Sequence, residues 1–161
     1  MTQPSRPKGK AGLVALVGAS AAALMVPLVA GWEGKSNDPY QDIIGVWTVC
    51  MGETRVEMRR YTDAECDEML AEGLGDFAAP VLARNPELRG RPEMLAAATS
   101  LAYNIGSANY AKSTVSRRFR QGRFREACDA FLMWNRAGGR VVRGLTNRRK
   151  AERDLCVGGL A

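Results

Sequence analysis

An uncharged, apolar stretch near the N-terminus constrains this chain more than any other feature. Residues 11–31 contain no charged side chain, and they follow a polar segment, residues 1–10, that carries Arg6, Lys8 and Lys10. As one helix, a stretch of this length would measure about 31 Å, which is close to the thickness of the hydrocarbon core of a bilayer. Basic residues on its N-terminal side predict a cytoplasmic tail at residues 1–10 and export of the remainder.

The same stretch is only weakly suited to permanent insertion. Seven alanines, three glycines and one serine lie among its residues, and Pro27 interrupts it. A cleaved signal peptide would need a small residue three positions before the cut, and Leu28 occupies that place if Ala30 is the last residue removed. A permanent anchor fits the length but not the composition, since Ala and Gly contribute little to insertion. The residues themselves leave both interpretations open.

Two carboxylates follow the apolar stretch at a spacing that suits glycoside hydrolysis. Glu33 lies at its exit, Asp42 comes nine residues later, and Thr48 lies six residues beyond Asp42. A helix end followed by a turn and strand-like residues would carry the two acids on different short elements, facing each other across a cleft. One acid can then protonate the leaving oxygen while the other directs water. The strand-like residues are Ile43, Ile44, Val46, Trp47 and Val49.

Composition narrows the remaining chemistry. The chain has 161 residues, of which about 130 follow the apolar stretch, enough for one domain with a core. It contains no histidine, which excludes a Ser-His-Asp triad, a Cys-His pair and a HExxH zinc site. Acid–base chemistry therefore falls to carboxylates, Lys, Tyr or Cys.

The C-terminal part is strongly basic. The net charge is +6, and residues 112–154 carry thirteen Lys or Arg against four acids. Such a surface favours an anionic polymer as partner. Zinc-finger spacing, a glycine-rich phosphate loop and a basic-aromatic RNA platform are all missing from the sequence, so we expect no nucleic acid as partner. A cell wall that bears carboxylates fits the charge, and so does a basic face that is merely solvated.

The spacing of Glu33, Asp42 and Thr48 resembles the catalytic triad of the phage-type lysozymes, glycoside hydrolase family 24, and especially the lambdoid endolysin branch. The resemblance extends in order over most of residues 31–161. It is carried by N-D-P-Y-Q-D-I-I-G-V-W-T-V-C, L-A-Y-N-I-G-S-A-N-Y, S-T-V-S-R-R-F and W-N-R-A-G-G-R-V-V-R-G-L-T-N-R-R-K-A-E-R-D-L-C. It implies an α+β, mainly α, two-lobed fold with a small β element, preceded by an N-terminal signal-anchor helix. The muramidase domain would span residues 32–161.

Local signals place the elements of that fold. Thr62 and Glu65 form a capping box that opens a helix running to about Arg84, with a kink at Pro80. Residues 38–60 should form turns and short strands, and a turn is expected at 137–139. Further helices are expected at about 93–105, 113–121, 123–135 and 145–157. Helical spacing assigns four residues to the core: Phe124, Cys128, Phe131 and Leu132.

The resemblance implies hydrolysis of the β-1,4 bond between N-acetylmuramic acid and N-acetylglucosamine, with inversion at the anomeric carbon and with no metal and no cofactor. Glu33 would be the general acid, kept protonated by apolar surroundings that include Trp32. Asp42 would stabilise positive charge on the sugar and, with Thr48, position water. Glu53 adds a third carboxylate where relatives often have histidine. The expected saccharide contacts are Gly52, Asn104, Ser113 and Arg140.

The resemblance also offers a third interpretation of residues 11–31, as a signal-arrest-release segment. Such a segment exports the enzyme, holds it inactive at the host inner membrane, and later leaves the bilayer uncleaved, so that the enzyme becomes soluble in the periplasm. Glu33, two residues past the stretch, would reach Asp42 only after release. We expect a monomer that acts with holin-type and spanin-type lysis proteins. The four cysteines are expected to pair within lobes, Cys50 with Cys66 and Cys128 with Cys156.

Three other functions fit parts of the sequence. A catalytically silent lysozyme-like domain could bind wall, a small membrane-active protein could perforate the bilayer with its apolar segment, and a lytic transglycosylase would need only the glutamate and would leave an anhydro sugar.

Overall fold

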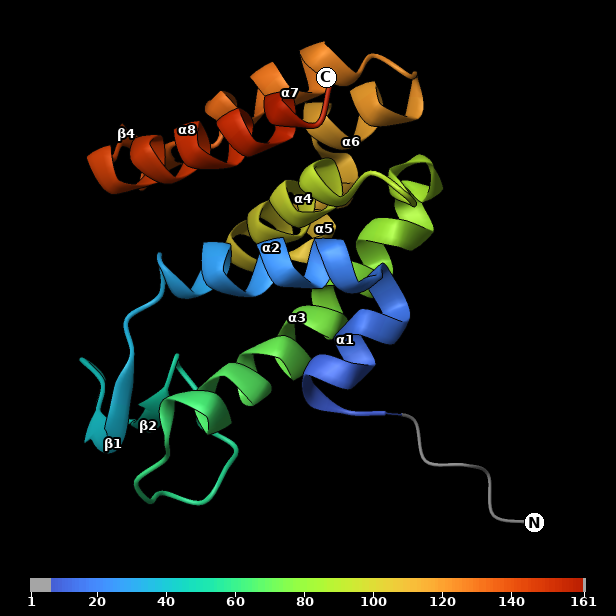
Figure 1. Cartoon of the computed structure of the whole chain (residues 1–161). Coiled ribbons are helices and arrows are strands. Elements are labelled where there is room, and N and C mark those ends of the chain that lie inside the picture. Colours follow the sequence, from blue (N-terminus) through green and yellow to red (C-terminus); the bar gives the residue numbers. More distant parts are fainter. Residues whose placement is uncertain (1–6, 161) are drawn as a thin grey trace.

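The computed structural model describes residues 7–160 and is mainly helical, with one small two-stranded sheet and one short hairpin (Figure 1). This is the fold class predicted from the sequence. The helices are α1 (Gly9–Val17), α2 (Ala19–Ala30), α3 (Asp63–Arg84), α4 (Pro92–Ile105), α5 (Ser107–Lys112), α6 (Thr114–Arg120), α7 (Phe124–Ala130) and α8 (Arg143–Gly158), with short 3₁₀ turns η1 (Pro86–Leu88) and η2 (Phe131–Met133). The strands are β1 (Ser36–Gln41), β2 (Trp47–Cys50), β3 (Arg136–Ala137) and β4 (Arg140–Val141).

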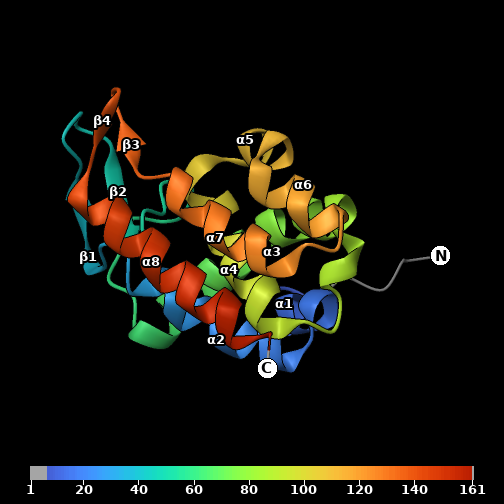
Figure 2. The same ribbon diagram turned by 90° about the horizontal axis from the view of Figure 1, so that it is seen from above.

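The apolar stretch forms two helices instead of one. The break falls at Gly18, whose φ of +89° is a left-handed value that glycine adopts without a Cβ penalty. α1 packs against α3 and α2 packs against α4, as both views show (Figures 1 and 2). The residues buried by this packing are Leu13, Ala21, Ala22, Met25, Val26 and Val29. Among residues 7–160, none of the helices combines the length and the apolar character needed to cross a membrane.

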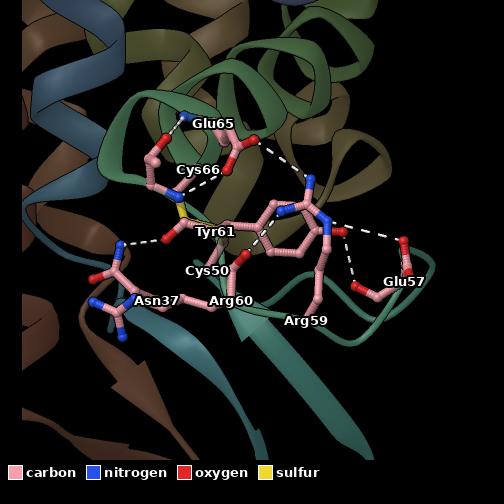
Figure 3. Close-up of polar contacts among 9 residues, drawn as sticks. Asn37, Cys50, Glu57, Arg59, Arg60, Tyr61, Glu65 and Cys66 are labelled. Carbon is pink, nitrogen blue, oxygen red and sulfur yellow. Dashed lines mark hydrogen bonds and ion pairs between the residues drawn. A yellow bond between two sulfur atoms is a disulfide. The ribbon is translucent and has the colours of Figure 1, made fainter.

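The long helix α3 begins where the capping box predicted. Thr62 accepts a hydrogen bond from the backbone N–H of Glu65, and the Glu65 side chain accepts one from the backbone N–H of Thr62. Figure 3 shows Glu65 at this helix start, beside the disulfide between Cys50 and Cys66. The disulfide ties β2 to the first turn of α3, which fixes the small sheet on the helix. α3 then continues through Pro80 to its end.

The small sheet pairs β1 with β2 in antiparallel register, with an irregularity between Ser36 and Tyr40. The prediction that Ile43 and Ile44 belong to a strand is wrong, because both lie in the connecting turn, where they are 103% and 79% exposed. The turn is closed by backbone bonds from Asp42 N–H to the Val46 carbonyl and from Gly45 N–H to the Asp42 carbonyl.

The helical lobe surrounds α4, which is buried continuously from Met94 to Ala102 because α2, α3 and α8 pack on it. The predicted helices are present within a few residues, but α5 was missed. The second expected disulfide, Cys128–Cys156, joins α7 to α8. Leu132 is 39% exposed, so its assignment to the core is wrong: it lies in η2, where the α-helical spacing no longer holds.

Candidate active site

Glu33 is positioned by the end of the second apolar helix. Trp32 and Glu33 both donate their backbone N–H groups to the Val29 carbonyl, at 3.0 and 3.1 Å, so the chain still follows the last turn of α2 at this point. Val29 itself is fully buried. The position of the Glu33 carboxyl, whose side chain is 28% exposed, therefore depends on the packing of α2 against the enzyme.

The Glu33 carboxylate forms an ion pair with Arg148 of α8. Arg148 Nη1 donates to Glu33 Oε1 at 2.9 Å, and the arginine side chain is only 6% exposed. The expectation that apolar surroundings, Trp32 included, keep Glu33 protonated stays a prediction; the structure places the guanidinium of Arg148 directly against this carboxyl. Trp32 is 38% exposed and does not enclose the carboxyl.

A buried charge cluster lies behind this ion pair. Glu152 Oε1 accepts from Arg148 Nε at 3.2 Å, from Arg149 Nη2 at 2.7 Å and from the Ser100 hydroxyl at 2.8 Å. Glu152 and Arg149 are completely buried. Burial raises the pKa of Glu152, although the two arginines and Ser100 oppose this, and burial likewise lowers the pKa of Arg149.

Asp42 and Thr48 are carried by the β1–β2 hairpin. Asp42 Oδ1 accepts the backbone N–H groups of Ile44 and Val46, both at 2.9 Å, so the side chain holds the turn that it opens. The hydroxyl of Thr48, a residue only 4% exposed, donates to the Val46 carbonyl at 3.0 Å. The hairpin thus presents the second carboxylate and the hydroxyl from one rigid turn.

Tyr103 of α4 is a group near Glu33 that sequence reasoning did not single out. Burial raises the pKa of the Tyr103 phenol, the charges of Glu33 and Glu53 raise it further, and Arg148 lowers it. Glu33, Glu53 and Arg148 therefore each lie within electrostatic range of Tyr103. Burial, aided by the charge of Glu72, also raises the pKa of Glu53.

The four residues expected to contact saccharide lie in different settings. Gly52 is in the exposed turn after β2, and Arg140 is exposed on β4. Asn104, near the end of α4, accepts a bond from Arg149 Nη1 at 3.0 Å. Ser113 is 4% exposed, and its hydroxyl donates to the Tyr110 carbonyl and accepts from the Ser116 N–H, so its observed role is to cap α6. The saccharide contacts stay predictions.

The elements that carry the predicted site residues lie on the same side of the molecule, although the β1–β2 sheet and β4 are well apart in Figure 1. In both views the β1–β2 sheet and the β3–β4 hairpin lie toward the same end (Figures 1 and 2), and the end of α2, which Glu33 follows, points toward it. Within the described part of the chain, no group of three or more His, Cys, Asp or Glu side chains could hold a metal ion.

A fold of two lobes with carboxylates on a helix end and on a hairpin is that of a lysozyme-type glycoside hydrolase. The chain belongs to the phage lysozyme family, whose model matches residues 30–152. It is 38% identical to the SAR-endolysin of Enterobacteria phage P21 over 95% of this chain and 98% of that protein. It is 39% identical to the SAR-endolysin of Bacteriophage PS119 over 80% and 78% of the two chains.

Solved structures agree with this assignment. The fold matches P22 lysozyme with a TM-score of 0.73 and 27% identity, over 82% of this chain and 94% of that one. The active form of the P1 phage endolysin Lyz matches with a TM-score of 0.73 over 98% of both chains, at 23% identity, and supports the fold alone. The protein is an endolysin that degrades peptidoglycan.

Proposed function

We propose that the protein hydrolyses the β-1,4 bond between N-acetylmuramic acid and N-acetylglucosamine, with Glu33, Asp42 and Thr48 as its catalytic residues. The observation that carries this proposal is the placement of Glu33 on the helical lobe, fixed by Arg148, and of Asp42 on the hairpin of the other lobe. Two carboxyl groups on opposing lobes are what a glycosidase needs on either side of the scissile bond.

In this mechanism Glu33 donates a proton to the leaving oxygen. Arg148 stabilises the carboxylate that remains after the transfer, which favours the transfer. Asp42 stabilises positive charge on the sugar ring and, together with Thr48, positions the attacking water. The saccharide is contacted by the exposed Gly52, Asn104 and Arg140 and by Ser113.

Activity is controlled by the location of residues 11–31. Before release, this segment spans the host inner membrane with residues 1–10 in the cytoplasm and the enzyme in the periplasm. Glu33 cannot then occupy its position in the active site. That position depends on the packing of α2 through Val29 and Met25, which are both fully buried. After release, the same residues fold as α1 and α2, and the enzyme acts as a soluble monomer in the periplasm beside holin-type and spanin-type lysis proteins.

The composition of the segment supports such a two-state behaviour. Ala21 and Ala22 are buried, so their small side chains belong to the face that packs on the enzyme in the released state. The same small residues make membrane insertion only weakly favourable. Both properties lower the free-energy difference between the inserted and the released state.

A digest of purified peptidoglycan with the wild-type protein, followed by analysis of the products, tests the proposed reaction. Hydrolysis leaves new reducing ends, which borohydride converts to alditols. We expect reducible muropeptides throughout. Products that are mainly anhydro-muramic species would identify a transglycosylase and overturn the proposal, and so would an intact wall.

A further inference from the structure

The buried carboxylate of Glu152 has no role in the reaction proposed above, although it touches both arginines that reach candidate site residues. Glu152 lies on α8, one turn after Arg148 and Arg149, with its side chain 0% exposed. Burying an ionisable group this completely is costly unless it is paired and hydrogen-bonded. Here Oε1 receives three donors, so the group is held in one orientation.

Arg148 is fixed at each of its three guanidinium nitrogens. Nε donates to Glu152, Nη2 donates to the Ser100 carbonyl at 3.4 Å, and Nη1 is left to reach Glu33. A planar guanidinium held at two corners can direct its third nitrogen in only one way. The direction of the bond to Glu33 is therefore set by Glu152 and by the backbone of α4.

We propose that Glu152 is a positioning residue, which holds Arg148 against Glu33 and balances part of its charge. This inference rests on the proposed function of Glu33. Without the negative charge at Glu152, Arg148 keeps one carboxylate partner, Glu33, and stabilises its ionised form more strongly. The proton donor is then lost at lower pH, so the rate at neutral pH falls although every catalytic residue is still present.

A second series of hydrogen bonds runs from Glu152 through Arg149 to Asn104. Arg149 donates to Glu152 through Nη2 and to Asn104 through Nη1. Glu152 therefore also fixes the side chain that orients Asn104, one of the expected saccharide contacts. The neighbouring titratable groups do not replace Glu152. Asp129 of α7, a neighbour of α8, pairs with Arg153. Tyr103 of α4 is a neutral phenol at neutral pH.

The test compares the pH dependence of kcat/KM for wild type and Glu152→Gln. Glutamine keeps the shape and an acceptor oxygen but removes the charge. We expect the alkaline limb of the kcat/KM profile to move to lower pH by roughly one unit. At pH values above the midpoint of the limb, kcat/KM should be about tenfold lower than that of the wild type. Asp154→Asn, an exposed substitution on the same helix, is the matched control and should leave the profile in place.

Loss of a buried charge can prevent folding, so a second variant is needed. Glu152→Gln combined with Arg149→Gln removes one charge of each sign and leaves Arg148 with Glu33 as its one carboxylate partner. We expect the same displacement of the alkaline limb in this double variant, measured on protein whose circular dichroism matches the wild type.

The outcomes separate this inference from the function on which it rests. A wild type that releases no reducing ends would overturn the proposed function and the inference with it. An active wild type whose profile coincides with that of the folded Glu152 variants would overturn the inference alone, and a lower rate without displacement of the limb would assign Glu152 a purely structural role.

Discussion

Arg148 and Glu33 lie 115 positions apart in the chain, yet their side chains form a hydrogen-bonded ion pair at 2.9 Å. The pair joins the last helix of the enzyme to the residue that follows the second apolar helix. Since the Arg148 guanidinium is buried and held by α4 and α8, it provides a fixed anchor to which Glu33 binds when α2 packs on the enzyme.

Removing this anchor should change the pH dependence in the direction opposite to that of the Glu152 variants. In Arg148→Gln, the ionised form of Glu33 loses its cation, so Glu33 keeps its proton to higher pH and the alkaline limb of kcat/KM moves upward by roughly one unit. The profile is measured on purified peptidoglycan, with the exposed substitution Lys150→Gln as control. If the alkaline limb stayed in place or moved to lower pH, Arg148 would not act on the proton donor as described.

Asp42 has both a structural and a catalytic role, and one substitution separates them. In Asp42→Asn the amide oxygen can still accept the N–H groups of Ile44 and Val46, so the turn and the melting temperature should be preserved. Activity should fall on the order of 100-fold or more, because the negative charge near the sugar is lost. If the variant kept wild-type activity, the contribution of Asp42 would be confined to the turn.

Leucine at two adjacent positions of α2 distinguishes membrane retention from packing. Ala22 is buried and Ala23 is exposed, so Ala22→Leu and Ala23→Leu raise the apolar character of the segment equally, but only the first changes the face that packs on the enzyme. We expect Ala22→Leu to remain in the membrane fraction without activity and Ala23→Leu to be released in part. Fractionation and lysis timing measure this, and soluble, active Ala22→Leu protein would contradict the release mechanism.

Glu53 should destabilise the enzyme near neutral pH. Burial and the charge of Glu72 raise its pKa above 4.5 in the folded state, so its protonated form is favoured by folding. The corresponding stabilisation is present below the unfolded value and is lost as the pH rises through the folded value. Glu53→Gln should therefore raise the melting temperature at neutral pH and leave it unchanged at a pH of about 4. Asp76→Asn, at an exposed position, is the control. Equal shifts of the melting temperature of Glu53→Gln at both pH values would contradict the raised pKa of Glu53 as the cause.

The elements set by local chemistry could be predicted from the sequence. The capping box at Thr62 and Glu65 needs only residues three apart, and α3 begins there in the structure. The disulfide partners were also predicted correctly, once the lobes were assigned by resemblance. By contrast, Ile43 and Ile44 were placed in a strand because of their β-branched side chains, whereas the bonds to Asp42 Oδ1 make that segment a turn.

The environment of Glu33 could not be predicted, because it depends on residues distant in the chain. The Arg148, Arg149 and Glu152 spacing indicates charges on neighbouring turns of a helix, which usually face solvent. Their burial follows only from the packing of α8 on α4. The division of the apolar stretch into α1 and α2 has the same origin, since its buried face is defined by α3 and α4.

The most direct test of the central claim is the rate at which Glu33→Gln degrades purified peptidoglycan, compared with wild type and with the exposed substitution Glu126→Gln. Glutamine can still bond to Arg148 but cannot donate a carboxylic proton, so we expect a folded protein whose rate is lower by about 100-fold or more, while the control keeps the wild-type rate. Degradation by Glu33→Gln at the wild-type rate would show that Glu33 is not the proton donor.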